Sequence, residues 1–98
     1  MTLPIVLRPE AEQDLMETRY WYDRQRHALG SEFAEEVFIV FDLLAEQPEL
    51  FPFSWEDIRT CRLRRFPYLV HDRAFPDRVE VLAVMHGSRD PSSWQSRA

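Results

Sequence analysis

The sequence predicts an α+β fold with the order β-α-α-β-β-β, in which an N-terminal strand and a helical hairpin pack on a mainly antiparallel sheet. Two observations support this fold class. Apolar residues recur with a helical period between residues 10 and 47, and from Ile58 onward they alternate with the period of a strand. In addition, the segment Val79 to Met85 is apolar on nearly both faces, as in a central strand. Such faces need a covering layer, which we expect the helices to supply on one side.

The first strand and the first helix meet at Pro9. Leu3 to Arg8 is a short apolar run, and Pro9 suits the first position of a helix that begins directly after it. Acidic residues in the first turns of this helix complement the positive end of its dipole. We expect the helix to continue to about Arg26, with a buried stripe formed by Ala11, Leu15, Thr18 and Tyr22.

The second helix is predicted to follow a turn at Gly30, with Ser31 as its N-cap. Pro48 ends it. Its apolar face consists of Phe33, Val37, Val40, Phe41 and Leu44. The two helices therefore form a hairpin. Carboxylates outside the apolar stripe, such as Glu32 and Glu36, are interpreted as a solvated face.

Residues 48–57 are predicted to form a loop. Its aromatic residues stand at alternate positions, Phe51, Phe53 and Trp55. We interpret the loop as a packed flap in preference to a partner-facing patch, because contiguous exposed apolar patches are uncommon. Two strands follow, one from Ile58 and one from residue 68 to residue 73, joined by a turn at residues 65–67. A second turn at residues 75–77 leads into the last strand.

Length and composition limit the classes of function. The chain has 98 residues, which fits a single domain over residues 1–98, and its formal net charge of -5 argues against direct, specific nucleic-acid binding. One cysteine, Cys61, excludes an intramolecular disulfide and a cysteine-rich metal site, and the histidines show no metal-ligand spacing. No leader and no membrane-spanning apolar segment are visible. We therefore expect a cytoplasmic protein without a cofactor, a metal or a membrane partner.

The stretch from Arg62 to Arg97 contains most of the functional information. It gathers the candidate partner-binding residues Arg62, Arg64, Arg65, Tyr68, Arg73, Arg89 and Trp94. Lysine is absent from the chain, so every fixed positive charge is an arginine. Because a guanidinium binds a carboxylate through two parallel hydrogen bonds, an acidic protein segment is as good a ligand for this cluster as a phosphate.

Two residues of this stretch are candidates for catalysis, His86 and Arg89. His86 can titrate near neutral pH and would act as a general acid beside Arg89. We favour the alternative that His86 connects the tail to the sheet by a hydrogen bond. His71 is interpreted as a cross-strand partner.

The remaining polar and aromatic residues of the stretch have structural interpretations. Arg64 and Arg65 are expected to pair with Asp72, with Glu80 or with carboxylates of a partner. Asp90 to Trp94 is expected to form a turn that leads into a last short helical segment. Trp94 is expected to anchor the tail on the core. Arg97, which lies beyond it, is expected to be mobile.

Paired motifs near the C-terminus resemble the RelE/ParE superfamily of type II toxins, and more closely its ParE branch of plasmid stabilisation proteins. The motifs are LRRFPYLVHDR, with its FPY turn, and VLAVMHGSRDPSSWQSR, in which an H-x-x-R-x-P-x-x-W pattern begins at His86. Further similarity lies in VLRPEAEQDL at the first strand and helix, and in WYDRQ near the end of that helix. The resemblance covers almost the whole chain and implies the same α+β fold.

The resemblance implies a toxin that a cognate, ParD-like antitoxin holds inactive, in a heterotetramer or a larger complex. ParE-like members inhibit DNA gyrase, whereas RelE-like members cleave mRNA in the ribosome, so the fold does not decide between these activities. RelE-like enzymes use a strongly basic set of residues that often includes lysines, together with a tyrosine or histidine near the end. Here lysine is missing, and the aromatic residue after Arg89 is Trp94, whose indole cannot transfer a proton at neutral pH.

The sequence therefore favours a gyrase inhibitor that acts by binding. An mRNA endonuclease that uses His86 and Arg89 is the first alternative, and a degenerate, non-toxic family member is the second.

Overall fold

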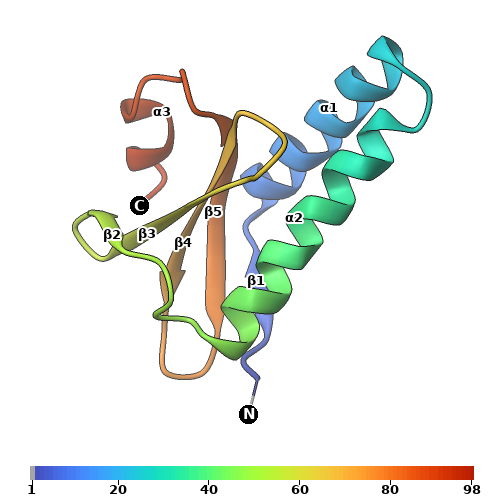
Figure 1. The fold of residues 1–98 in the computed structure, drawn as a ribbon. Coiled ribbons are helices and arrows are strands. Elements are labelled where there is room, and N and C mark those ends of the chain that lie inside the picture. The colour runs from blue at the N-terminus through green and yellow to red at the C-terminus, as the bar shows by residue number, and fades with distance from the viewer. Residues whose placement is uncertain (1) are drawn as a thin grey trace.

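The computed structural model describes residues 2–98, which form a five-stranded sheet and three helices (Figure 1). In chain order the elements are β1 (Ile5–Leu7), α1 (Pro9–Gln25), α2 (Leu29–Glu46), β2 (Phe53–Trp55), β3 (Ile58–Arg62), β4 (Tyr68–Ala74), β5 (Val79–His86) and α3 (Ser92–Gln95). The predicted α+β class and the order of the main elements are confirmed. Within the predicted 48–57 loop the chain forms the additional edge strand β2.

The sheet has the strand order β1-β5-β4-β3-β2, so β5 is an interior strand between β1 and β4, as its apolar sequence predicts, and β4 is the middle strand. β5 pairs in parallel with β1 and antiparallel with β4, and the remaining pairs are antiparallel. The pairing of β4 with β5 is irregular at Leu82, because His71 lies opposite Ala83 whereas Asp72 lies opposite Val81.

α1 and α2 pack as a hairpin against one face of the sheet (Figure 1). The main core lies between this hairpin and the sheet. It includes the fully buried Ala11, Phe33 and Leu44 together with residues of the facing strands. Cys61 belongs to this core and is a free thiol. Burial, with a smaller contribution from Asp72, raises the pKa of this thiol to about 11. The thiol is therefore protonated at neutral pH.

The turn between α1 and α2 differs from the prediction. Ala28, which has a left-handed φ of 65°, is the N-cap of α2, and Gly30 and Ser31 lie inside the helix. The Gly30 amide donates a hydrogen bond to Asp23 Oδ1 at 2.8 Å, so a side chain of α1 satisfies a free donor of the first turn of α2. A Cβ atom at Gly30 would lie 2.2 Å from the Arg19 carbonyl oxygen. Gly30 therefore permits close packing of the two helices.

The opposite face of the sheet carries a second, smaller core. It contains Ile58, Leu82 and Met85, and α3 covers it with Trp94, which is 7% exposed. The Trp94 ring stacks on His71 with a centroid distance of 4.1 Å, and Trp55 packs edge-on at 6.1 Å. The predicted last helical segment and the anchoring role of Trp94 are thus confirmed.

Arg97 is held in place, so the prediction of a mobile side chain is wrong. Its guanidinium pairs with Asp14 of α1, with N–O distances of 2.6 and 3.1 Å, and donates a further hydrogen bond to the Leu82 carbonyl at 3.0 Å. Asp14 also accepts a hydrogen bond from the Val84 amide at 3.1 Å. Because β1 ends at Leu7, this ion pair satisfies backbone groups of β5 that no strand reaches.

Candidate partner-binding site

An aromatic cluster fixes the FPY turn between β3 and β4. Phe66 and Tyr68 pack edge-on against Phe33 of α2 and Tyr22 of α1, with centroid distances between 4.9 and 6.0 Å. His86 packs edge-on against Tyr68 from the end of β5, at 5.3 Å. Edge-to-face contacts of this kind stabilise beyond the area that they bury. The turn is therefore a rigid platform, and the arginines on either side of it have defined positions.

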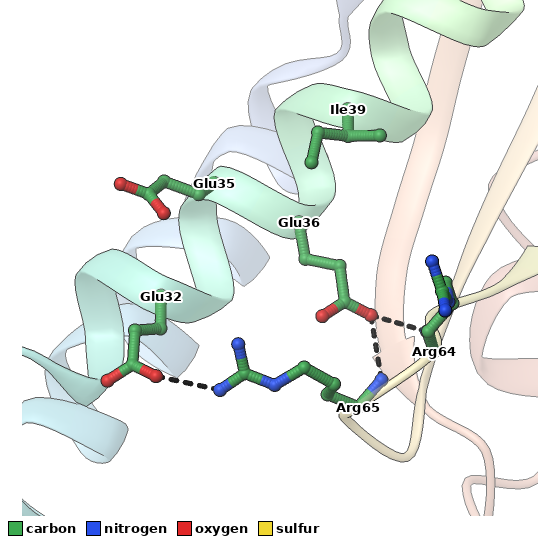
Figure 2. A pocket seen from close by; sticks show the side chains of 6 residues that line it. All are labelled: Glu32, Glu35, Glu36, Ile39, Arg64 and Arg65. Atoms are coloured by element: carbon green, nitrogen blue, oxygen red, sulfur yellow. Dashed lines mark hydrogen bonds and ion pairs between the residues drawn. The ribbon is translucent and has the colours of Figure 1, made fainter.

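Beside this turn, α2 and the β3–β4 connection enclose a pocket of about 320 Å³, lined by Glu32, Glu35, Glu36, Ile39, Arg64 and Arg65 (Figure 2). Glu36 Oε1 accepts hydrogen bonds from the backbone amides of Arg64 and Arg65, the latter at 2.8 Å. One carboxylate of α2 thus holds the chain at the start of the FPY turn. Glu36 is partly exposed, as the interpretation of a solvated face predicts, but it also has a structural role that this interpretation did not include.

Glu32 also has specific partners. Its Oε1 accepts from Arg65 Nη2 at 2.7 Å, and its Oε2 lies 3.2 Å from Arg26 Nη2. The hydrogen bond from Arg65, helped by Arg26, holds the pKa of Glu32 below its ordinary value. The predicted pairing of Arg65 with Asp72 or Glu80 is therefore wrong, because Glu32 on α2 is closer. Glu80 instead pairs with Arg8 and Arg78.

Three groups of the pocket remain available to a partner. Within residues 2–98, neither the Arg64 guanidinium nor the Glu35 carboxylate makes a hydrogen bond or an ion pair. Figure 2 shows the Glu35 side chain directed away from the two arginines. Ile39, one turn further along α2, is 60% exposed. The pocket thus offers one positive, one negative and one apolar contact.

The two candidate catalytic residues lie at a different place. A pocket of about 210 Å³ between α1 and the end of β5 is lined by Asp14, Glu17, Thr18, Tyr68, Val84, Met85, His86 and Arg89. His86 Nδ1 lies 3.0 Å from the Ser88 amide nitrogen and 2.8 Å from the Ser88 hydroxyl. Because an amide can only donate, Nδ1 is the acceptor, and neutral His86 carries its proton on Nε2. The structure brings His86, Arg89 and Tyr68 together beside two carboxylates.

The other predicted site residues do not join either pocket. Arg62 lies on β3 opposite Leu69, on the strand face away from the main core. Arg73 pairs with Asp57 at 2.9 Å, and this bond lowers the pKa of Asp57. Trp94 is buried under the tail. The seven candidate residues are therefore distributed over several surfaces.

His71 and Asp72 are buried polar residues of β4. His71 Nδ1 lies 2.8 Å from Oγ1 of Thr60, and Thr60 is the residue of β3 that lies directly opposite His71. This contact agrees with the cross-strand interpretation of His71. Burial, with a smaller contribution from Arg97, lowers the pKa of His71 to about 4. Asp72 is fully buried, and within residues 2–98 neither of its carboxyl oxygens has a hydrogen-bond partner. Burial raises its pKa to about 7, against a smaller opposing effect of Arg59.

Sequence reasoning missed Asp14 and Glu36 as positioning residues. Both belong to acidic helix faces, and no local pattern distinguishes them from neighbouring carboxylates. Among residues 2–98, no group of three or more side chains is arranged to hold a metal ion. None of the helices in this part of the chain is long and apolar enough to cross a membrane.

Comparison with known proteins gives two findings. The family model for the ParE toxin of the type II toxin-antitoxin system parDE matches residues 5–91. A chain from a solved chromosomal ParDE system of P. aeruginosa superimposes with a TM-score of 0.76 at 15% sequence identity, covering 87% of this chain and 96% of the other. A search of curated protein sequences finds no match.

Proposed function

The chain belongs to the ParE toxin family of type II toxin-antitoxin systems, and we propose on that premise that it inhibits DNA gyrase by binding to it. A cognate antitoxin neutralises it. In this proposal the chain is a binding protein and catalyses no reaction.

One observation supports binding over RNA cleavage. The pocket that contains His86 and Arg89 is also lined by Asp14 and Glu17, and a neighbouring groove along α1 adds Glu10. Glu10 and Glu17, which unlike Asp14 make no ion pair within residues 2–98, repel the phosphates of a polynucleotide, whose binding depends on neutralisation by positive charge. A protein surface with isolated charged groups has no such continuous negative charge. The acidic pocket therefore favours a protein target.

The antitoxin contact is assigned to the pocket between α2 and the FPY turn. A helix and an extended segment of the antitoxin would lie along the groove between the hairpin and the sheet, with an apolar side chain on Ile39 and a carboxylate on Arg64. The free Glu35 would accept a basic residue. Two toxin chains on a dimeric antitoxin would give a heterotetramer.

Supercoiling by purified gyrase, measured with and without this protein, tests the target. We expect inhibition and a stabilised cleavage complex, both reversed by the antitoxin encoded beside the toxin. If gyrase supercoils DNA normally at excess toxin, the gyrase assignment is wrong.

A ribosome-dependent mRNA endonuclease is the second candidate. The shared pocket of His86, Arg89 and Tyr68 supports it, because it places a histidine, a fixed positive charge and a hydroxyl within one site. Translation-dependent cleavage that disappears in His86→Ala and Arg89→Ala would establish this activity. Wild-type protein that cuts no mRNA in a reconstituted translation reaction would exclude it. A chain that arrests no growth without its antitoxin would instead be a degenerate family member.

A further inference from the structure

The tip of the helical hairpin projects away from the sheet (Figure 1), yet it is firmly packed. The bond from the Gly30 amide to Asp23 and a hydrogen bond of 3.3 Å from Arg19 to the Ser31 hydroxyl join the two helices there. A Cβ at Gly30 would overlap the α1 backbone, which shows how close the helices lie. Such a tip loses little conformational entropy when a partner binds.

Large apolar side chains are exposed near this tip without an evident structural role. Met16 is 67% exposed and Tyr20 is 68% exposed. They lie one helical turn apart, on the face of α1 opposite the buried Ala11 and the core-packed Tyr22. Trp21, the next residue in the chain after Tyr20, is 51% exposed but points to another side of the helix. Tyrosine, tryptophan and arginine are the residue types that contribute most binding energy in protein interfaces.

Positive charge surrounds these side chains. Arg19 lines a shallow groove with Met16 and Tyr20, and the Arg24 guanidinium lies 5.8 Å from the centroid of the Tyr20 ring. Asp23, the acidic residue of the same groove, already accepts a hydrogen bond from Gly30. Arg19 and Arg24 together outnumber this one carboxylate, so these residues carry a small positive charge on a chain whose formal net charge is -5. Its complement is an apolar pocket bordered by carboxylates.

We propose that this tip face, formed by Met16, Arg19, Tyr20 and Arg24, is the surface through which the toxin contacts its protein target. This face fits into an apolar pocket of the target that is bordered by carboxylates. The proposal rests on the proposed function, and it separates the target contact from the antitoxin pocket at Arg64. The antitoxin then need not cover the tip face to bind.

A second copy of this chain is a poorer complement. The acidic pocket beside α2 has two of its three carboxylates engaged with Arg65 and with the FPY turn, so only Glu35 is free. Contact between the tip face of one copy and that pocket on the next would join two different surfaces, which leads to rings or open filaments. Self-association is therefore one of the outcomes that the experiment must distinguish.

The test compares two double variants with a control. Met16→Ala/Tyr20→Ala and Arg19→Glu/Arg24→Glu alter the tip face, whereas Phe53→Ala removes another exposed aromatic residue, from the edge strand β2. We expect at least a tenfold loss of gyrase inhibition for each double variant, about 1.4 kcal/mol, and none for the control. Antitoxin affinity should stay at the wild-type value in all three, and so should the melting temperature of Met16→Ala/Tyr20→Ala and of Phe53→Ala. Arg19→Glu/Arg24→Glu loses the Arg19–Ser31 hydrogen bond and is compared at a temperature at which it remains folded.

Three results would overturn the tip proposal: tip variants that inhibit gyrase like wild type, tip variants that lose antitoxin affinity to the same extent, or a wild-type oligomer that only the tip variants dissolve. The gyrase assignment fails separately. If wild type halts growth without inhibiting gyrase and the tip variants relieve the arrest, the target is wrong but the surface is supported. If wild type does neither, both proposals fail.

Discussion

Two adjacent residues of β4, His71 and Asp72, are buried with opposite consequences for stability. Burial raises the pKa of Asp72 to about 7. The protonated carboxyl group therefore makes its full contribution to stability below pH 3.8, and this contribution is lost as pH rises towards 7. The pKa of His71 is lowered to about 4, so stability falls as pH decreases from 6.5 towards 4. Between about pH 4 and pH 6.5 the two slopes oppose each other.

Asp72→Asn should reveal this compensation. Of these two residues, only His71 makes stability depend on pH in this variant. Between pH 4 and pH 6.5 the free energy of unfolding of the variant should therefore rise by roughly 3 kcal/mol more than that of the wild type. At pH 8 the variant should also avoid the cost of a buried carboxylate, on the order of 4 kcal/mol before the unpaired amide is counted. Urea unfolding over a series of pH values measures both effects. Parallel profiles for wild type and variant would contradict the prediction.

Arg97 tests how the tail is held. Arg97→Met keeps the length of the side chain but leaves Asp14 without its partner and the Leu82 carbonyl without a donor. We expect a loss of about 2 kcal/mol in unfolding free energy and faster hydrogen exchange in α3. Arg89→Met is the matched control, since the Arg89 side chain is exposed and makes no ion pair within residues 2–98. Equal stabilities of the two variants would show that the contacts of Arg97 with Asp14 and Leu82 contribute nothing to stability.

At the scale of elements, the close approach of α1 and α2 depends on Gly30. Alanine is normally the better helix residue, yet Gly30→Ala should destabilise the protein by about 1–3 kcal/mol, because the new Cβ would meet a backbone oxygen that cannot move alone. Gly87→Ala is the control, since its Cβ would be 3.6 Å from the nearest atom, an ordinary contact. Thermal unfolding of both variants measures the difference. A stabilised Gly30→Ala would show that the hairpin can separate without cost.

Local patterns predicted most elements, because the period of apolar residues reflects which face is buried. Pro9 predicted the start of α1, Pro48 predicted the end of α2, and the apolar β5 segment predicted an interior strand of the sheet. The contacts that complete the sites were not predictable in this way. Glu36 reaches Arg64 across 28 positions, and Asp14 reaches Arg97 across 83. Such pairs depend on how elements pack, which residue spacing does not encode.

The start of α2 shows the same limit at a single turn. Ser31 and Gly30 are ordinary N-cap and turn residues, so the sequence favours a helix that begins after them. Instead, Asp23 of α1 satisfies a donor of the first turn, and the helix begins at Leu29. A tertiary contact thus replaces the local cap.

At the scale of the whole molecule, we propose that two charged surfaces serve different partners. Arg64→Glu should weaken antitoxin binding at least tenfold, because it places a negative charge where an antitoxin carboxylate is expected. Arg24→Glu, on the tip face, should leave that affinity unchanged. Calorimetric titration with the antitoxin at two salt concentrations measures both variants. Equal losses would indicate that one surface serves both partners.

The single buried thiol has a practical consequence. Cys61 lies in the main core, and its raised pKa keeps the sulfur protonated, so alkylating reagents can reach a reactive thiolate only when β3 opens. The rate of labelling in native buffer therefore measures the free energy of opening without an added probe. The same reaction can be repeated with each partner bound. A slower rate of Cys61 labelling would show that the partner suppresses the opening of β3, and an unchanged rate would show that it does not.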